Sequence, residues 1–354
     1  MNNSSVIVAV PVRDEAARIG RCLSALNQQM RPPDTVVLML NNCTDETETI
    51  ARAMMPNLRF DLDVISCDLP PAEADAGHAR RLAMDVAAQR VEPSGVLLTT
   101  DADAIVPPDW VIGNLYALRS GVDIVCGQAV IDPLEAMTIP AHLHADDARE
   151  CRLLALLDDF AWMLDPEPHD PPPRHPEASG ASLAVSVEAF RRVGGIPAIA
   201  SGEDRAFVRA LWMIDARVRH DPAIQVTVSG RIEGRAPGGM ADTIRRRIVR
   251  QDEFADQMAE PATDAYLRYS LRHRARRAWR GLAEPGLAGD LALPEASVAI
   301  ALSDRYFGSA WAKLEAASPA LQRRRIRFTE LPAEIATAER LWHLLTAPET
   351  LAAD

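Results

Sequence analysis

The sequence has little of what marks a disulfide-rich, membrane-spanning or nucleic-acid-binding protein. Its five cysteines are scattered, odd in number and without C-x-x-C spacing, so we expect reduced thiols and no zinc site. No apolar run approaches the ~20 residues that a bilayer span requires, and the first residues lead straight into an expected strand. We therefore expect neither a cleaved signal nor a membrane-spanning segment, and a cytoplasmic location.

A basic surface is also missing. The net charge of −12 argues against a general nucleic-acid binder, because neutralising phosphates requires clustered Lys and Arg. What is present is ample material for a core: 354 residues, 48% of them hydrophobic and 25% charged. These values predict a globular protein of one large or two medium domains.

The first half of the chain alternates between strand and helix patterns. Val6–Val12 is a nearly continuous apolar run, and Ile19, Leu23 and Leu26 follow it at helical spacing. Further strands are expected at residues 35–40, 63–66, 95–100 and 122–129, with a helix over about 73–89. Strands that alternate with helices imply a parallel sheet with right-handed crossovers. This half is therefore predicted to be a nucleotide-binding type of α/β domain.

The second half changes character. A helix is expected over residues 148–164, followed by a loop at 166–176 that holds six prolines and is either a linker or an acceptor-binding loop. Strands at 182–185 and 225–228 then surround a helix at 204–214, and helices continue from 240. The arginine-rich stretch 268–280 is either a solvated face that answers acidic neighbours or a surface that attracts a phosphorylated acceptor or anionic lipid.

Two carboxylates stand where the strand at residues 95–100 ends, in the sequence Asp101-Ala102-Asp103. Ligands of open parallel sheets bind outside the carboxyl ends of the strands, and residues i and i+2 of an extended chain point the same way. The pair can therefore hold one divalent cation, with positions left open for the phosphate oxygens of a nucleotide diphosphate. The alternative is that both are ordinary turn or capping carboxylates.

Other short motifs accompany this pair in a fixed order. They are Pro11-Val-Arg13-Asp14-Glu15, Asn41-Asn42-Cys-Thr-Asp45, Ala79-Arg80, Ser179-Gly180-Ala181-Ser182 and Gly202-Glu203-Asp204. Together with Asp101-Ala102-Asp103, this series resembles the family 2 glycosyltransferases of the GT-A fold, of the bacterial type with a helical C-terminal extension. The resemblance covers roughly residues 5 to 235.

The resemblance implies a fold and a division of the chain. The fold is α/β, with a Rossmann-like mixed sheet flanked by helices, followed by an all-α C-terminal region. Residues 1–239 would form the transferase domain, with 1–130 as the donor-nucleotide half and 131–239 as the acceptor half. Residues 240–354 would form the helical extension.

The resemblance also implies roles for individual residues. Asp103, with Asp101, would hold a divalent metal, Mn²⁺ or Mg²⁺, against the diphosphate of a nucleotide-sugar donor. Asp204 would be the general base for the acceptor hydroxyl, and Glu203 would assist it. The residues that would contact the donor are Pro11, Arg13, Glu15, Asn41, Asn42, Asp45, Arg80, Asp101, Ala102, Asp103 and Arg235.

The expected reaction is therefore metal-dependent, inverting transfer of a hexose to the hydroxyl of a small molecule, glycan or lipid-linked acceptor. Many relatives have a carboxylate for the uracil ring where this chain has Asn41 and Asn42, which leaves the base open. Three alternatives remain: a retaining transferase, a nucleotidyltransferase on the same fold, and a catalytically silent scaffold that binds sugar nucleotides. Expected partners are the donor and acceptor, with no nucleic acid and with peripheral membrane contact at the inner face as a further option.

Overall fold

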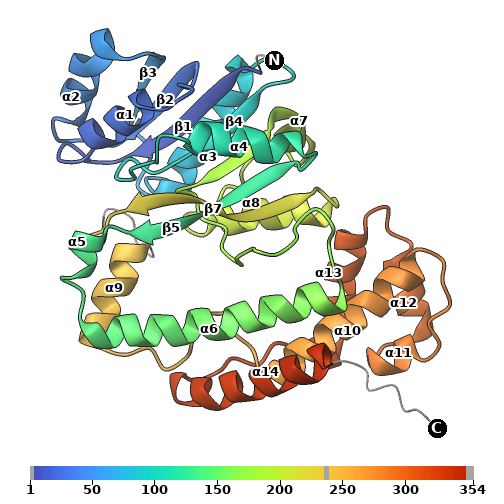
Figure 1. The fold of residues 1–354 in the computed structure, drawn as a ribbon. Helices are drawn as coiled ribbons and strands as arrows, with labels where there is room; N and C mark the ends of the chain where they lie inside the picture. The colour runs from blue at the N-terminus through green and yellow to red at the C-terminus, as the bar shows by residue number, and fades with distance from the viewer. Residues whose placement is uncertain (1–3, 235–238, 348–354) are drawn as a thin grey trace. The chain divides into compact units, whose positions relative to one another are not determined.

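The computed structural model describes residues 4–234 and 239–347. The chain divides into two compact units, and each is described by itself (Figure 1). Unit 1 comprises residues 1–139 and 173–246, and unit 2 comprises residues 140–172 and 247–354. The division between them falls within α9 (Met240–Val249).

Unit 1 is built on one seven-stranded sheet in the order β3-β2-β1-β4-β6-β5-β7. Its first four strands are parallel: β1 (Val6–Val12), β2 (Thr35–Asn41), β3 (Asp61–Cys67) and β4 (Val96–Thr99). Every residue of β1 is buried, because helices cover both faces of this part of the sheet. Because these strands are parallel, the carboxyl ends of β1, β2 and β4 lie at the same edge of the sheet.

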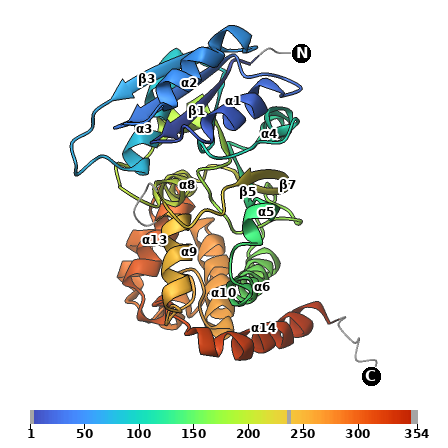
Figure 2. The same ribbon diagram turned by 90° about the vertical axis from the view of Figure 1, so that its left-hand side faces the viewer.

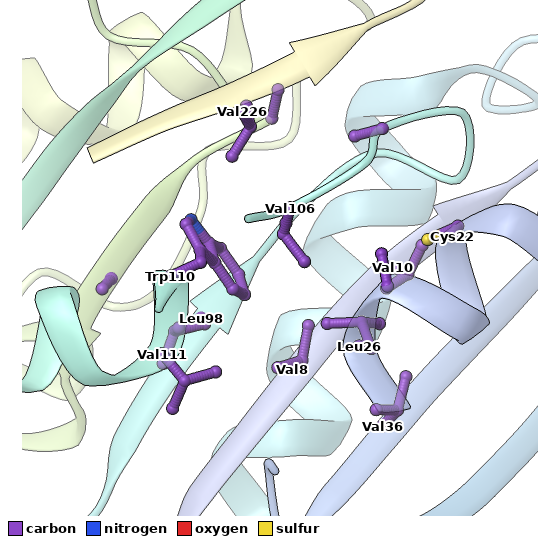
Figure 3. Close-up of a cluster of buried hydrophobic side chains, with 14 of the residues drawn as sticks. Val8, Val10, Cys22, Leu26, Val36, Leu98, Val106, Trp110, Val111 and Val226 are labelled. Carbon is purple, nitrogen blue, oxygen red and sulfur yellow. The ribbon is translucent and has the colours of Figure 1, made fainter. Parts of the chain in front are cut away.

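The alternation of side chains along β1 separates the core of unit 1 into two layers. Val8 and Val10 point to the layer that contains Leu26 of α1 (Ile19–Asn27) and Trp110 of α4 (Trp110–Arg119), as Figure 3 shows. Ile7 and Ala9 point to the opposite layer, which is covered by α3 (Ala76–Arg90), α7 (Val187–Arg192) and α8 (Glu203–Met213). The period of two in the strand thus places helices on both faces.

The other half of the sheet departs from the parallel arrangement expected of βα repeats. β6 (Leu183–Ser186) runs antiparallel to both β4 and β5 (Ile124–Ile131), and β7 (Val218–Val228) pairs in parallel with β5 at the edge. Pro222 lies in β7 between the pairs Cys126–His220 and Gln128–Gln225, where the register with β5 shifts, and an irregular edge strand tolerates a proline. The mixed sheet implied by the family resemblance is confirmed. The remaining helices of unit 1 are α2 (Thr47–Met54) and α5 (Pro133–Ala136).

Unit 2 is helical. Its long helices α6 (Ala141–Leu164), α10 (Ala262–Trp279) and α14 (Leu331–Thr346) pack on one another around Leu153, Phe160, Ala265 and Leu331 (Figure 2). Shorter helices α11 (Leu287–Asp290), α12 (Glu295–Leu302) and α13 (Phe307–Ala317) complete the unit. The predicted helical C-terminal region is confirmed.

The division of the chain differs from the predicted boundary between residues 239 and 240. Residues 140–172 belong to unit 2, because the apolar side of α6 lies in the same core as α10 and α14. The sequence places α6 beside the acceptor half in chain order, and only packing reveals its partners. The proline-rich segment after α6 contains neither helix nor strand, as expected of a loop.

The arginines of the stretch 268–280 are largely paired with acids of unit 2. Arg268 Nε donates to Glu260 at 2.9 Å, and Arg272 and Arg276 both contact Asp165, at 2.7 and 2.8 Å. Arg274 and Arg277 both contact Glu284. These pairs favour the first of the two interpretations, a face that answers acidic neighbours. Among the described residues, no helix is long and apolar enough to cross a membrane.

Candidate active site

The predicted donor motifs gather at the shared carboxyl edge of β1, β2 and β4. Glu15 follows β1, Asn41 ends β2, and Asp101 follows β4 after one intervening residue. Asp101 and Asp103 lie in a turn closed by the bond from Ala104 N to Asp101 O (3.1 Å), and not on an extended strand as expected. The turn gives the two carboxylates different partners.

Arg80 links the turn after β4 to the start of α8. It lies in the second turn of α3, whose first turn is capped by Asp75 through the backbone N–H of His78 (2.9 Å). Arg80 Nη2 donates to Asp101 Oδ1 at 2.6 Å and Nε to Glu203 Oε1 at 2.9 Å. Burial alone would lower the pKa of Arg80, but the charges of Asp101 and Glu203 outweigh it and raise the pKa. Arg80 is therefore a permanent cation between the two acidic motifs.

Gly180 approaches the guanidinium so closely that a side chain there would displace it. Arg80 Nη1 donates to Thr99 Oγ1 and to Gly180 O, both at 2.8 Å. A Cβ at position 180 would lie 2.4 Å from Arg80 Cζ. The N–H of the same glycine donates to Asp204 Oδ2 at 2.8 Å. One backbone segment thus connects Arg80 with Asp204, and Asp101, Glu203 and Asp204 are brought into one site.

Glu203 and Asp204 differ in exposure, although both belong to the first turn of α8. The Glu203 side chain is 7% exposed and accepts from Arg80, whereas Asp204 is half-buried. Acidic residues also suit a helix N-terminus, so the two carboxylates stabilise the helix as well. The geometry leaves Asp204 the more accessible of the two.

Arg231 is a site residue that the sequence interpretation missed. It follows β7, and its guanidinium grips Glu15 through Nη1 to Oε2 (2.8 Å) and Nη2 to Oε1 (2.6 Å). The same Nη2 lies 3.2 Å from Asp103 Oδ2. The signal was present, because Arg231 lies in the glycine-rich segment from which Arg235 was singled out. Arg235 itself lies outside the described residues.

A fixed turn delivers Arg231 to this place. Glu135 Oε2 accepts from Ser229 Oγ (2.8 Å) and from Gly230 N (2.7 Å), while its Oε1 accepts from Arg18 (2.7 Å). A Cβ on Gly230 would lie 2.7 Å from Ile131, so this close approach requires glycine. Burial alone would raise the pKa of Glu135, but these hydrogen bonds outweigh it and lower the pKa, which keeps the carboxylate ionised.

Asp103 is partly buried beside two other acids, Asp101 and Glu15. Burial, followed by the charges of Asp101 and Glu15, raises its pKa to about 6, and Arg231 offsets only part of this. Burial and the same acids raise the pKa of the neighbouring Cys22 thiol. All five cysteines are free thiols, as expected. Asp103 is therefore a partly buried carboxylate with acids and arginines as neighbours, and burial is the main reason that its pKa is raised.

The residues present fit a divalent cation that is shared with a diphosphate. Within the described ranges, no group of three or more His, Cys, Asp or Glu side chains is arranged to hold a metal alone. Two hard carboxylate oxygens nevertheless suffice when phosphate oxygens and water complete the shell, as is usual for Mg²⁺. Such a cation would favour the ionised form of Asp103, which burial disfavours.

The remaining predicted donor residues line the same edge but make contacts within the protein. Arg13 donates to the carbonyl of Ala74, Asn42 Nδ2 donates to Leu69 O (3.1 Å), and Asp45 accepts from Ala16 N (3.0 Å). Asn41 Nδ2 donates to Asp75 O (2.9 Å), and its buried Oδ1 has no hydrogen-bond partner among the described residues. Pro11 and Ala102 are buried. Contact of these residues with a donor stays a prediction.

Three of the solved structures that this chain resembles illustrate the comparison. A mannosyltransferase of Pyrobaculum calidifontis, in complex with GDP-Man and Mn²⁺, is 19% identical with a TM-score of 0.47, over 96% of this chain and 81% of that chain. TarS 1-349 of S. aureus, in complex with UDP-GlcNAc, is 16% identical with a TM-score of 0.48, over 96% and 92%. Glucosyl-3-phosphoglycerate synthase of Mycobacterium tuberculosis, with Mn²⁺ and UDP, is 17% identical with a TM-score of 0.41, over 80% and 82%.

These identities and scores are too low to carry an argument about activity, and no curated protein matches the chain. The family model gives a further comparison. Residues 7–164 match the model described as "Glycosyl transferase family 2", a stretch that includes the first three predicted donor motifs and Asp101-Ala102-Asp103. Residues 7–164 are thus similar to glycosyl transferase family 2, and the predicted resemblance is confirmed over that stretch.

Proposed function

We propose that this protein transfers a hexose from a nucleotide-diphosphate sugar to an acceptor hydroxyl, with inversion at the anomeric carbon. The observation that carries the proposal is the ordered site at the carboxyl edge of the sheet. There Arg80 holds Asp101 and Glu203, and Gly180 holds Asp204. A donor diphosphate placed at that edge would lie beside Asp103 and Arg231.

Asp204 is the proposed general base. Its Oδ2 is oriented by Gly180 N–H, and its partial exposure leaves the carboxylate open to an acceptor. Removing the acceptor proton as attack proceeds is worth roughly 10²- to 10⁴-fold in rate. Attack from the face opposite the leaving diphosphate inverts the anomeric centre. Glu203 is the proposed positioning residue, since its carboxylate is engaged by Arg80.

Asp103, assisted by Asp101, is the proposed site for Mn²⁺ or Mg²⁺. When bound, such an ion supplies Lewis-acid stabilisation of the charge that gathers on the leaving diphosphate. Asp101 is fixed by Arg80, and Asp103 is held in a turn, so both carboxylates are oriented before the donor arrives. Asn41 Oδ1, buried and without a partner among the described residues, is a proposed acceptor for an N–H of the donor base.

The test begins with thermal-shift screening of UDP-, GDP- and dTDP-sugars with Mn²⁺, because a ligand raises stability by mass action. The donor found is then used with Asp204→Asn, whose amide oxygen can still accept from Gly180 N–H. We expect donor affinity to be kept and kcat to fall by about 10²-fold or more. Glu188→Gln, an exposed carboxylate in the first turn of α7, is the matched control. Full turnover in Asp204→Asn would remove this residue from the base role.

A further inference from the structure

Arg231 occupies the side of Asp103 that faces Glu15. Its Nη2 is shared between Glu15 Oε1 (2.6 Å) and Asp103 Oδ2 (3.2 Å), and Nη1 closes a two-point contact with Glu15. The pairs are shielded from water, since the side chains of Arg231, Asp103 and Glu15 are 19%, 16% and 5% exposed. Screening is weak in such a place, so one added or removed charge acts strongly on its neighbours.

We propose that Arg231 is an internal counter-ion that competes with the divalent cation for Asp103 and is transferred to the donor diphosphate when both bind. This inference rests on the proposed function, in which Asp103 holds the metal. In the free protein the guanidinium pairs with Glu15 and Asp103. A divalent cation at Asp103 would then lie close to a second positive charge, the guanidinium of Arg231. The free protein should therefore bind metal weakly.

Binding of the diphosphate would remove this repulsion between the metal ion and Arg231. A planar guanidinium bonds phosphate oxygens in the same two-point manner as it bonds Glu15, so an arriving diphosphate offers Arg231 an equivalent partner. The anchor of the turn on Glu135 keeps the backbone of Ser229 and Gly230 in place while the side chain moves. Metal and donor thus bind with positive coupling, since each removes an obstacle to the other.

The coupling predicts effects of opposite sign for one substitution. Arg231→Gln removes the competing charge, so Mn²⁺ alone should bind about 10-fold tighter, which corresponds to about 1.4 kcal/mol. With Mn²⁺ present, UDP or GDP, whichever the wild type binds better, should bind about 10-fold more weakly, because the partner for the diphosphate is gone. A residue that only stabilises the fold would not shift the two affinities in opposite directions.

In the first experiment the full chain is titrated with Mn²⁺ alone, and electron paramagnetic resonance measures the concentration of free ion. In the second, calorimetry measures the binding of UDP and GDP at a fixed Mn²⁺ concentration. Arg231→Lys keeps the charge and should keep weak Mn²⁺ binding. Arg52→Gln, which removes an exposed arginine paired with Glu48 on α2, is the control for net charge. If Arg231→Gln does not fold, Glu15→Gln/Arg231→Gln is compared with Glu15→Gln, because the double variant removes both charges of the Arg231–Glu15 pair and leaves only Asp103 without its arginine.

The outcomes separate this inference from the proposed function. Loss of Mn²⁺ binding in Asp103→Asn, with tighter binding in Arg231→Gln, supports both. Loss in Asp103→Asn while Arg231→Gln stays within threefold of the wild type overturns the counter-ion alone. Unchanged Mn²⁺ binding in Asp103→Asn overturns the metal assignment itself. If neither the wild type nor Arg231→Gln binds Mn²⁺ at millimolar concentration, the counter-ion is also overturned, since its removal should have exposed the site.

Discussion

Replacing Arg80 with methionine would test whether one buried cation holds the two acidic motifs together. Arg80 is 5% exposed and Glu203 7%, so the variant leaves the Glu203 carboxylate buried without its partner. Asp101, at 33% exposed, can regain water and contributes less. Breaking a buried pair by removing one partner costs about 3–5 kcal/mol. We expect unit 1 to lose stability of this order.

The assay must report on unit 1, because two compact units need not unfold together. Native-state hydrogen exchange of the amides in β4 (Val96–Thr99) gives the opening free energy of the central sheet. The double variant Arg80→Met/Glu203→Gln should be about 1–3 kcal/mol more stable than the sum of the single changes predicts, because it removes both charges of the buried pair and leaves neither one alone. A loss below about 1 kcal/mol in Arg80→Met would refute the reasoning.

Two further predictions concern close packing and pH. Gly180→Ala should destabilise unit 1 by about 1–3 kcal/mol and lower kcat, because the new Cβ would lie 2.4 Å from Arg80 Cζ. The control is Gly289→Ala, which has open space around the new Cβ and should leave the stability in chemical denaturation nearly unchanged. Burial alone would raise the pKa of Glu167, but His169, Arg272 and Arg276 outweigh it and hold the pKa well below its usual value of 4.5. Its stabilisation is therefore complete above that value and lost as pH falls. The difference between wild type and Glu167→Gln, on the order of 2 kcal/mol at pH 7, should shrink by pH 3, and a constant difference would contradict the assignment.

Much of the fold could be predicted from local pattern. The strand at Val6–Val12, the strands that follow it up to β6 and α3 lie within a few residues of their expected positions, because apolar periodicity is a local property of the chain. The last strand, β7, begins seven residues before its expected start at residue 225. The placement of α6 in unit 2 could not be predicted, since it depends on which apolar faces meet. The antiparallel direction of β6 likewise depends on the path of the chain between β5 and β6, which residue patterns do not encode.

The sequence by itself determined the family resemblance of residues 7–164, the strand-end position of Asp101-Ala102-Asp103 and the order of the motifs, because each is carried by neighbouring residues. Only the tertiary structure decided the partners. In the tertiary structure Arg80 bonds Asp101 and Glu203, which are 21 and 123 residues away in the sequence, and Arg231 bonds Glu15, which is 216 residues away. Ion pairs between buried groups depend on distance in space, and separation along the chain gives no measure of that distance. The counter-ion of Asp103 therefore became visible only after folding brought the end of β7 beside the end of β1.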